Sequence, residues 1–186
     1  PTRRSSDLRS LIEWTGATPV PIALHESRGF AFSAEEVLGL ITPRTRLMIV
    51  NSPANPTGGV VPQAELDRLV EGLERHPQIA VMSDEIYARM CYDGVPHASL
   101  TTYPEIADRL ILLDGWSKTY AMTGWRVGWM IGPSDVMKAA INFQSHSTSN
   151  VTNVAQVAVD GGAPADEARP DAAASGQAGG NDADQP

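Results

Sequence analysis

The chain has 186 residues, of which 42% are hydrophobic and 19% are charged, as in an ordinary folded domain or a piece of a larger one. Its net charge of -8 argues against a nucleic-acid groove, which needs a basic surface. No apolar run approaches the length of a membrane span, so we expect neither a nucleic-acid nor a membrane partner. The single cysteine, Cys91, cannot form an internal disulfide, which predicts a reducing, cytoplasmic setting.

Both ends differ in composition from the middle of the chain. The first eight residues, PTRRSSDL, equal the translation of a common sequencing-adapter oligonucleotide, and we interpret residues 1–8 as an adapter-derived artefact. Residues 160–186 form an acidic, low-complexity segment that has no large apolar side chain. Such a composition predicts disorder, either as a natural acidic tail or as a frame-shifted extension.

Between these ends, strand-like and helix-like segments alternate. The capping box of Ser33 and Glu36 predicts the start of one helix. One apolar face of the next is formed by Leu66, Leu69, Val70 and Leu73. This alternation predicts an α/β fold, with a mostly parallel sheet and helices on both faces. In chain order we expect a strand at 18–24, a helix at 33–41, a strand at 46–51, a helix at 62–75, strands at 78–84, 109–115 and 125–132, and a capped helix at 134–146.

Polar segments follow three of the expected strands. NSPANPTGG (51–59), SDEIY (83–87) and DGWSK (114–118) each begin where an apolar run ends. Ligands of open parallel sheets bind beyond the carboxyl ends of the strands, where these segments meet. We therefore expect the side chains that follow these strands to form one site, and its candidate members are Asn55, Asp84, Tyr87 and Lys118.

Each candidate side chain suits a particular chemistry. An amine such as that of Lys118 becomes a nucleophile once it loses its proton, which apolar surroundings and a nearby cation favour. Asp84 follows a buried strand, where a carboxylate needs a partner such as a protonated ring nitrogen; a helix cap or a structural salt bridge is the alternative. Arg126 offers a planar charged fork suited to phosphate, or it serves as a structural arginine.

Taken together, NPTGG, SDEIY and SKTYAMTGWRVGW resemble the class I/II aminotransferases, which are fold-type-I pyridoxal-phosphate-dependent enzymes. The motifs occur in the family's order and near its spacing, over residues 9–159. The resemblance implies that residues 9–159 are part of the family's large, cofactor-binding domain. Trp116 is a departure, because the family usually has a smaller residue there, and we interpret it as a change in local packing.

The resemblance also implies a role for each candidate residue. Lys118 would form a Schiff base with pyridoxal 5'-phosphate and then carry the proton of the substrate α-carbon. Asp84 would bind the pyridine nitrogen so that the ring acts as an electron sink. Three further roles are implied: Tyr87 and Asn55 would hydrogen-bond the 3'-oxygen of the ring, Arg126 would bind the phosphate, and Ser117 is a second phosphate candidate.

The reaction implied is transamination between an amino acid and a 2-oxo acid, by a parent protein that is a homodimer. A C–S lyase, or another enzyme of the superfamily, shares the same cofactor residues and is the first alternative. The second is a non-catalytic sensor domain of a regulator. The family's phosphate loop, its ring-stacking aromatic residue and its substrate-carboxylate arginine are missing here, so we expect impaired activity. The four scattered histidines have no metal-binding spacing, and we expect no metal.

Overall fold

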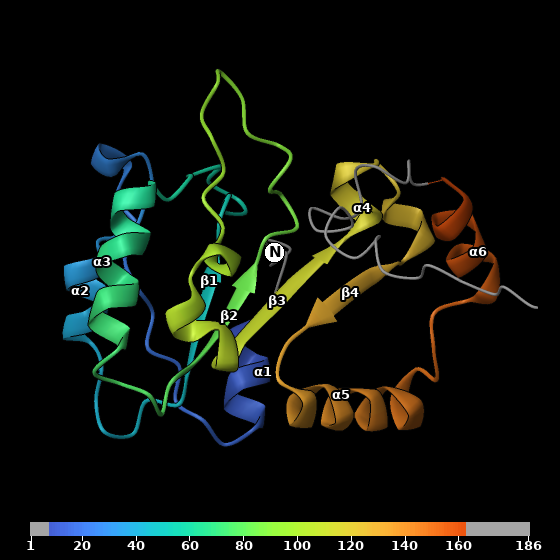
Figure 1. Cartoon of the computed structure of the whole chain (residues 1–186), viewed down its shortest axis with the longest axis horizontal. Coiled ribbons are helices and arrows are strands. Elements are labelled where there is room, and N and C mark those ends of the chain that lie inside the picture. The colour runs from blue at the N-terminus through green and yellow to red at the C-terminus, as the bar shows by residue number, and fades with distance from the viewer. Residues whose placement is uncertain (1–7, 163–186) are drawn as a thin grey trace, which may run out of the picture.

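The structure, a computed structural model, describes residues 8–162, and a four-stranded sheet lies at its centre (Figure 1). The strands are β1 (Leu47–Asn51), β2 (Ala80–Asp84), β3 (Leu110–Gly115) and β4 (Gly128–Ile131), in that order across the sheet. The first three run parallel, whereas β4 is antiparallel to β3. The predicted α/β class with a mostly parallel sheet is confirmed. Most of the two predicted end segments lies outside the described residues.

Helices connect the strands and flank the sheet. Two of the three expected helices precede β1 and β2, and the third follows β4. The α-helices are α1 (Leu8–Trp14), α2 (Ala34–Gly39), α3 (Gln63–Leu73), α4 (Trp116–Thr119), α5 (Ser134–Ser147) and α6 (Asn153–Gly162). Single turns of 3-10 helix lie at Glu26–Arg28 (η1), Leu100–Thr102 (η2) and Thr123–Trp125 (η4), and a longer one at Pro104–Arg109 (η3).

Helices α2 and α3 begin where the sequence predicts, but only half of the predicted capping box forms, because the Glu36 carboxylate pairs with Arg28. The side chain of Ser33 accepts a hydrogen bond from the backbone N–H of Glu36 at 3.4 Å, which satisfies one of the free donors at the start of α2. Pro62 stands just before α3, where its missing N–H costs nothing. The predicted apolar face of α3 is buried, and its members Leu66, Leu69, Val70 and Leu73 are each at most 3% exposed.

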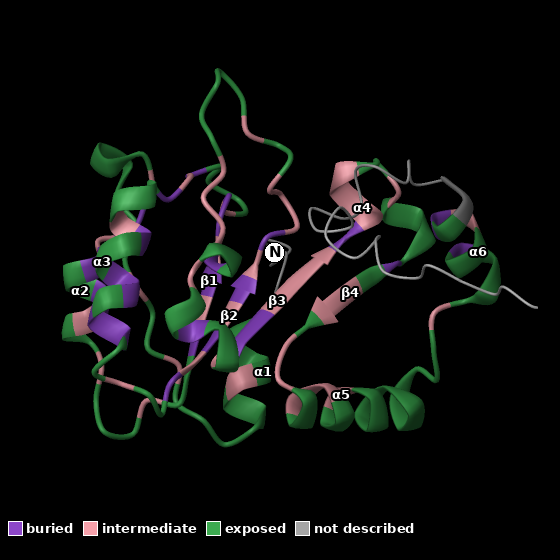
Figure 2. Cartoon of the chain, viewed as in Figure 1, coloured by how far each residue is buried: buried purple, intermediate pink, exposed green. Residues whose placement is uncertain are grey.

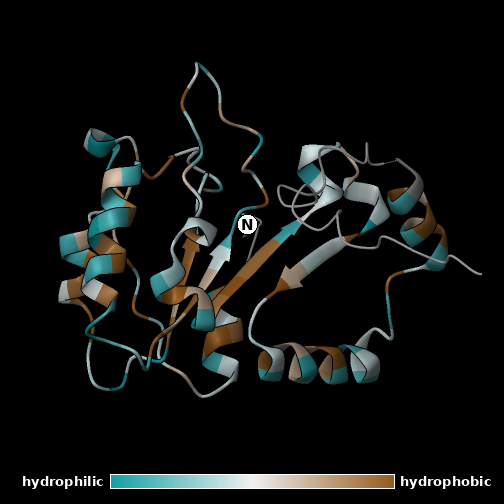
Figure 3. Cartoon of the chain, in the orientation of Figure 1, coloured by the Kyte–Doolittle hydropathy of each residue, from teal (hydrophilic) through white to brown (hydrophobic). Residues whose placement is uncertain are grey.

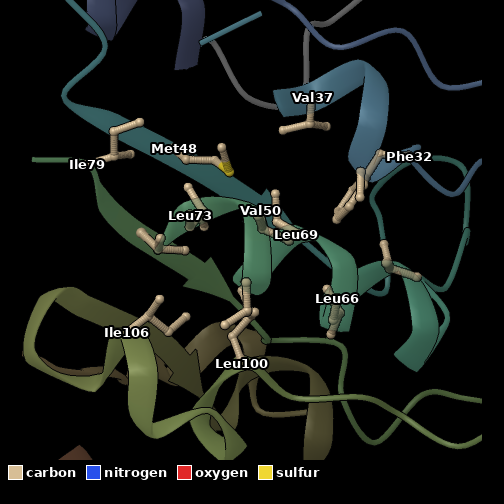
Figure 4. Packing of buried hydrophobic residues seen from close by; sticks show 14 of the residues in the cluster. Phe32, Val37, Met48, Val50, Leu66, Leu69, Leu73, Ile79, Leu100 and Ile106 are labelled. Carbon is tan, nitrogen blue, oxygen red and sulfur yellow. The ribbon is translucent and has the colours of Figure 1, made fainter. Parts of the chain in front are cut away.

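The main hydrophobic core lies between helices α2 and α3 and one face of the sheet (Figures 2 and 4). Alternate residues of β1, Met48 and Val50, point into it, as does Val81 of β2. The residues between them face the other side, where Ile49 and Met82 are only partly buried. This alternation matters for the site, because adjacent residues at a strand end point to opposite faces.

Three predicted details were wrong. Residues 18–24 form no strand, because Pro19 and Pro21 remove backbone N–H groups that a sheet ladder needs. The last strand begins at Gly128 instead of residue 125, since residues 123–125 form η4. Helix α5 has Pro133 at its N-cap and no side-chain cap, so the expected capped start is absent.

Helix α5 is poorly covered by protein. It has no buried residue, and its Ile141 and Phe143 are 66% and 67% exposed. Figure 3 shows that α5 carries hydrophobic as well as hydrophilic residues. A second, smaller apolar cluster joins Val127 to Ala155 and Val159 of α6, and Trp116 packs against it. Trp116 therefore has the packing role that its departure from the family motif suggested. Within residues 8–162, no helix is both long enough and apolar enough to cross a membrane.

Candidate active site

The segment that follows β1 forms a rigid turn at the carboxyl end of the sheet. Asn51, the last residue of β1, donates from its side-chain amide to the backbone oxygen of Asp84 at 3.1 Å. Its side-chain oxygen accepts from the backbone N–H of Asn55 at 2.9 Å. Gly58 has a φ of +73°, which L side chains rarely adopt, and its N–H closes the turn on the oxygen of Ala54 at 2.7 Å. Asn51 therefore fixes both the end of β2 and the place of Asn55.

Asn55, Tyr87 and Lys118 lie together at this edge of the sheet. The side-chain amide of Asn55 donates to the Tyr87 hydroxyl oxygen at 3.1 Å. The Nζ atom of Lys118 lies 5.8 Å from the centre of the Tyr87 ring, within the range of a cation–π contact. Three segments that are far apart in sequence thus meet as predicted. Because Asn55 donates to Tyr87, the phenol keeps its own proton available for another acceptor.

Asp84 is the last residue of β2, and its side chain is half-buried. Burial raises the pKa of its carboxyl above the ordinary value, the backbone N–H of Ile86 (3.3 Å) opposes this shift, and the charge of Glu85 adds to it. Its backbone is paired with Asn51 on β1 and with Leu113 on β3. The strand register therefore holds Asp84 between the two segments that carry Asn55 and Lys118.

Lys118 lies on α4, the single helical turn that begins directly after β3 (Figure 1). The approach to this turn is tight, because a Cβ built on Gly115 would lie 2.8 Å from the Cα of Gly128 and from the oxygen of Val127. Only glycine allows β3 and β4 to come this close before the chain turns into α4.

The turn between Lys118 and Arg126 is strained. Ala121 and Arg126 both have positive φ angles, 53° and 56°, a conformation that costs L residues about 1–3 kcal/mol and that clusters at functional sites. Thr123 holds the turn to α4, since its hydroxyl donates to the backbone oxygen of Ser117 at 2.8 Å. The Arg126 guanidinium donates to the backbone oxygen of Thr123 at 3.3 Å and is otherwise exposed. Ser117 and Arg126 are thus tied to one turn through Thr123.

A hollow of about 370 Å³ lies between this turn and α6. Apolar or small side chains line most of it, and none of the six predicted site residues does. The residues that line it are Ala121, Gly124, Trp125, Thr152, Val154 and Ala155. The cluster of Asn55, Tyr87 and Lys118 therefore lies outside this hollow.

Two residues that sequence reasoning did not select also shape this region. Asn51 joins β1 to Asp84, and the only signal for it was its place at the end of a strand. The second is Glu85, for which the only signal in the sequence is its place directly after Asp84. In the structure it is 6% exposed and accepts several hydrogen bonds on the buried face of the sheet.

The sequence of the chain is similar to those of known proteins. The family model described as aminotransferase class I and II matches residues 5–173. An aspartate aminotransferase of Streptomyces avermitilis is 42% identical over 143 residues, which are 76% of this chain and 35% of that protein. An arginine–pyruvate transaminase of Pseudomonas aeruginosa is 46% identical over 119 residues, which are 64% of this chain and 30% of that protein.

The same likeness appears in three dimensions. The crystal structure of the aspartate aminotransferase from Rhizobium meliloti superposes with a TM-score of 0.78 at 37% identity, over 83% of this chain and 39% of that one. The chain thus spans between 30% and 39% of the length of these relatives.

Proposed function

This chain belongs to the class I and II aminotransferase family, and we propose that its parent protein transfers an amino group from an amino acid to a 2-oxo acid with pyridoxal phosphate. The observation that carries the proposal is the meeting of Asn55, Tyr87 and Lys118 beside Asp84 at the carboxyl edge of the sheet. An amine, a carboxylate, a phenol–amide pair and a guanidinium form a donor set that fits this cofactor.

Lys118 is the residue to which we assign the chemistry. Bound pyridoxal phosphate supplies an aldehyde that an amine can capture and a ring that withdraws electrons from the substrate α-carbon. The chain has only two lysines, and the other, Lys138, is exposed on α5. Lys118 holds its amine over the Tyr87 ring, and we propose that the same amine removes and returns the α-proton.

Asp84 is proposed to hold the ring nitrogen. A half-buried carboxylate with a raised pKa gains most from a cationic or N–H partner, because that partner offsets its loss of hydration. The pyridine nitrogen, once protonated, is such a partner. Tyr87 and Asn55 are proposed to donate to the ring 3'-oxygen, which their mutual hydrogen bond leaves them free to do.

Arg126 and Ser117 are proposed to bind the phosphate. The guanidinium makes one long hydrogen bond, to Thr123, and keeps its remaining N–H groups for a ligand. Because Thr123 joins Ser117 and Arg126 to one turn, a phosphate held by both would also fix the position of Lys118 between them.

The substrate is proposed only by class. The relatives' names include aspartate and arginine as amino acids and pyruvate as a 2-oxo acid, which supports an amino acid donor and a 2-oxo acid acceptor without selecting a side chain. We also propose a homodimeric parent protein, as the family resemblance implies. The lone Cys91 supports a location in the reducing cytoplasm.

The direct test is an amino-transfer assay on the full-length gene product, with a panel of amino acids and 2-oxoglutarate. We expect transfer by the wild type and by Lys138→Ala, and a loss of at least about 100-fold in Lys118→Ala, because the proton carrier is gone. Release of ammonia with a 2-oxo acid, and no transfer, would instead favour the lyase alternative. A Lys118→Ala protein that is as active as the wild type would overturn the proposal.

A further inference from the structure

The adjacent carboxylates Asp84 and Glu85, at the end of β2, point to opposite faces of the sheet. Asp84 lies on the half-buried side, where the candidate site is. Glu85 lies on the side of Ser83, which faces the buried helical layer, and is 6% exposed. A carboxylate so deeply buried is stable only when hydrogen bonds replace its water.

Glu85 is the centre of such a network. Its Oε1 atom accepts from the hydroxyls of Ser83 and Ser99, at 2.9 and 3.0 Å, and from the backbone N–H of Leu100 at 3.2 Å. Its Oε2 atom lies 2.8 Å from Nε2 of His97. Burial alone would raise the pKa of Glu85, but the hydrogen bonds from His97, Ser99 and Ser83 outweigh burial and lower it, so the network binds an ionised carboxylate.

The network closes a long loop at its base. Residues 85–100 leave β2, extend away from the sheet and return at η2, as the long loop at the top of Figure 1 shows. Glu85 stands at the departing end, and Ser99 and Leu100 at the returning end. Tyr87 lies on the departing side, two residues from Glu85, so the base of the loop sets where its phenol can lie.

The backbone of Glu85 makes a second connection. Its N–H donates to the oxygen of Leu113 on β3 at 2.9 Å, and β3 leads directly to Lys118. One residue is thus bonded to the end of β2, to β3 and to the far end of the loop. Asp84, Tyr87 and Lys118 all belong to segments that Glu85 joins.

We propose that Glu85 is a positioning residue for the cofactor: it touches no ligand, and it fixes Asp84 and Tyr87 by joining both ends of the 85–100 loop to the sheet. This inference rests on the proposed function, because Asp84 and Tyr87 matter in this way only if they bind pyridoxal phosphate. The ligand is the one proposed for that site, and Glu85 acts on its binding indirectly, from the buried face of the sheet.

His97 makes a conservative variant informative. An ionised Glu85 carboxylate can only accept, so the Nε2 atom that faces it carries the proton. The Nδ1 atom of His97 is buried without a hydrogen-bond partner among the described residues. In Glu85→Gln, the amide oxygen can still accept from the serines, but the amide N–H groups face His97. To accept from them, His97 must move its proton to the unpartnered Nδ1. Glutamine should therefore preserve only some of the hydrogen bonds that join the two ends of the 85–100 loop.

The test measures the affinity of the full-length apoprotein for pyridoxal phosphate, by quenching of protein fluorescence, together with its thermal unfolding. We expect Glu85→Ala to weaken binding by about tenfold and Glu85→Gln by about threefold, since a buried donor set loses its acceptor wholly or partly. Should Glu85→Ala not fold, Ser99→Ala, which removes one donor from the returning end, is expected to weaken binding by about threefold.

Tyr103→Phe is the matched control, because Tyr103 lies outside the 85–100 loop and the change removes only hydrogen bonds to Asp67 and Gln63 of α3. It should lower the unfolding temperature and leave the affinity within about twofold of the wild type. Wild-type affinity in a folded Glu85→Ala or Ser99→Ala, or an equal loss in Tyr103→Phe, would overturn the positioning role. A wild type that binds no cofactor would overturn the proposed function itself.

Discussion

The buried carboxyl group of Asp84 lowers the free energy of unfolding by an amount that depends on pH. Burial raises its pKa, so the folded state binds this proton more tightly than the unfolded state does. Below the ordinary pKa of an aspartate, about 3.9, both states are protonated and there is no penalty. As the pH rises through the ordinary and then the raised pKa, the buried charge forms and the free energy of unfolding falls.

Asp84→Asn should therefore stabilise the apoprotein relative to the wild type, by an amount that grows as the pH rises from about 4 to 7. The same change should weaken cofactor binding by about 10- to 100-fold, since it removes a charged hydrogen-bond partner. Urea unfolding at both pH values and a cofactor titration measure the two effects. Equal stability differences at pH 4 and pH 7 would contradict the first, and unchanged affinity the second.

For single residues, the sequence predicted which side chains meet at the site but not which residues keep them in place. Asn55, Tyr87 and Lys118 could be grouped because each follows the end of a strand, and parallel strands end at the same edge. The partnership of Glu85 with His97 could not be predicted, because it depends on how a loop returns to the sheet. Periodicity describes neighbours within one element and says nothing of such a return.

Helix α3 supplies most of the helical layer over the sheet. Leu69 is fully buried in the main core, and truncating such a leucine leaves a cavity beside the sheet. Leu69→Ala should lower the free energy of unfolding of the full-length protein by about 2–5 kcal/mol. Glu71→Ala, on the exposed face of the same helix, should change it by less than about 0.5 kcal/mol. Similar losses in both variants, measured by urea unfolding, would mean that α3 does not cover a core.

The contact between β3 and β4 sets where α4, the turn that carries Lys118, begins. In Gly115→Ala the new methyl group would meet the backbone at Gly128 and Val127, which cannot move as a flexible side chain can. We expect a loss of about 1–3 kcal/mol in stability and weaker cofactor binding. Gly39→Ala, where nothing lies within 4 Å, is the control and should lose neither. Unfolding curves and cofactor titrations of both variants measure these effects. Normal cofactor binding by Gly115→Ala would contradict the role of this contact in placing Lys118.

Elements were predictable where one residue pattern dominated. The apolar face of α3 predicts a helix. The apolar runs of β1, β2 and β3 predict strands. Residues 18–24 have the apolar content of a strand, but their prolines remove the donors that strand pairing needs. The sharp turn at Arg126 shortened the last strand for a reason that only the backbone angles reveal.

The molecule as described leaves apolar surface uncovered on α5 and α6. Ile141, Phe143, Val154 and Val157 are all more than 60% exposed, and the chain spans between 30% and 39% of the length of its relatives. The isolated 186-residue chain should therefore self-associate, because exposed apolar patches adhere to each other. Sedimentation should detect this, and Ile141→Lys with Phe143→Lys should reduce it. A monodisperse isolated chain would contradict the expectation.

Identification of the residue that carries the cofactor tests the central claim most directly. The full-length protein is incubated with pyridoxal phosphate, reduced with borohydride, digested and analysed by mass spectrometry. We predict that the added mass lies on the peptide that contains Lys118, and that Lys118→Ala abolishes it while Lys138→Ala leaves it unchanged. A label on Lys138 or on a lysine elsewhere in the protein, or no label at all, would contradict the account.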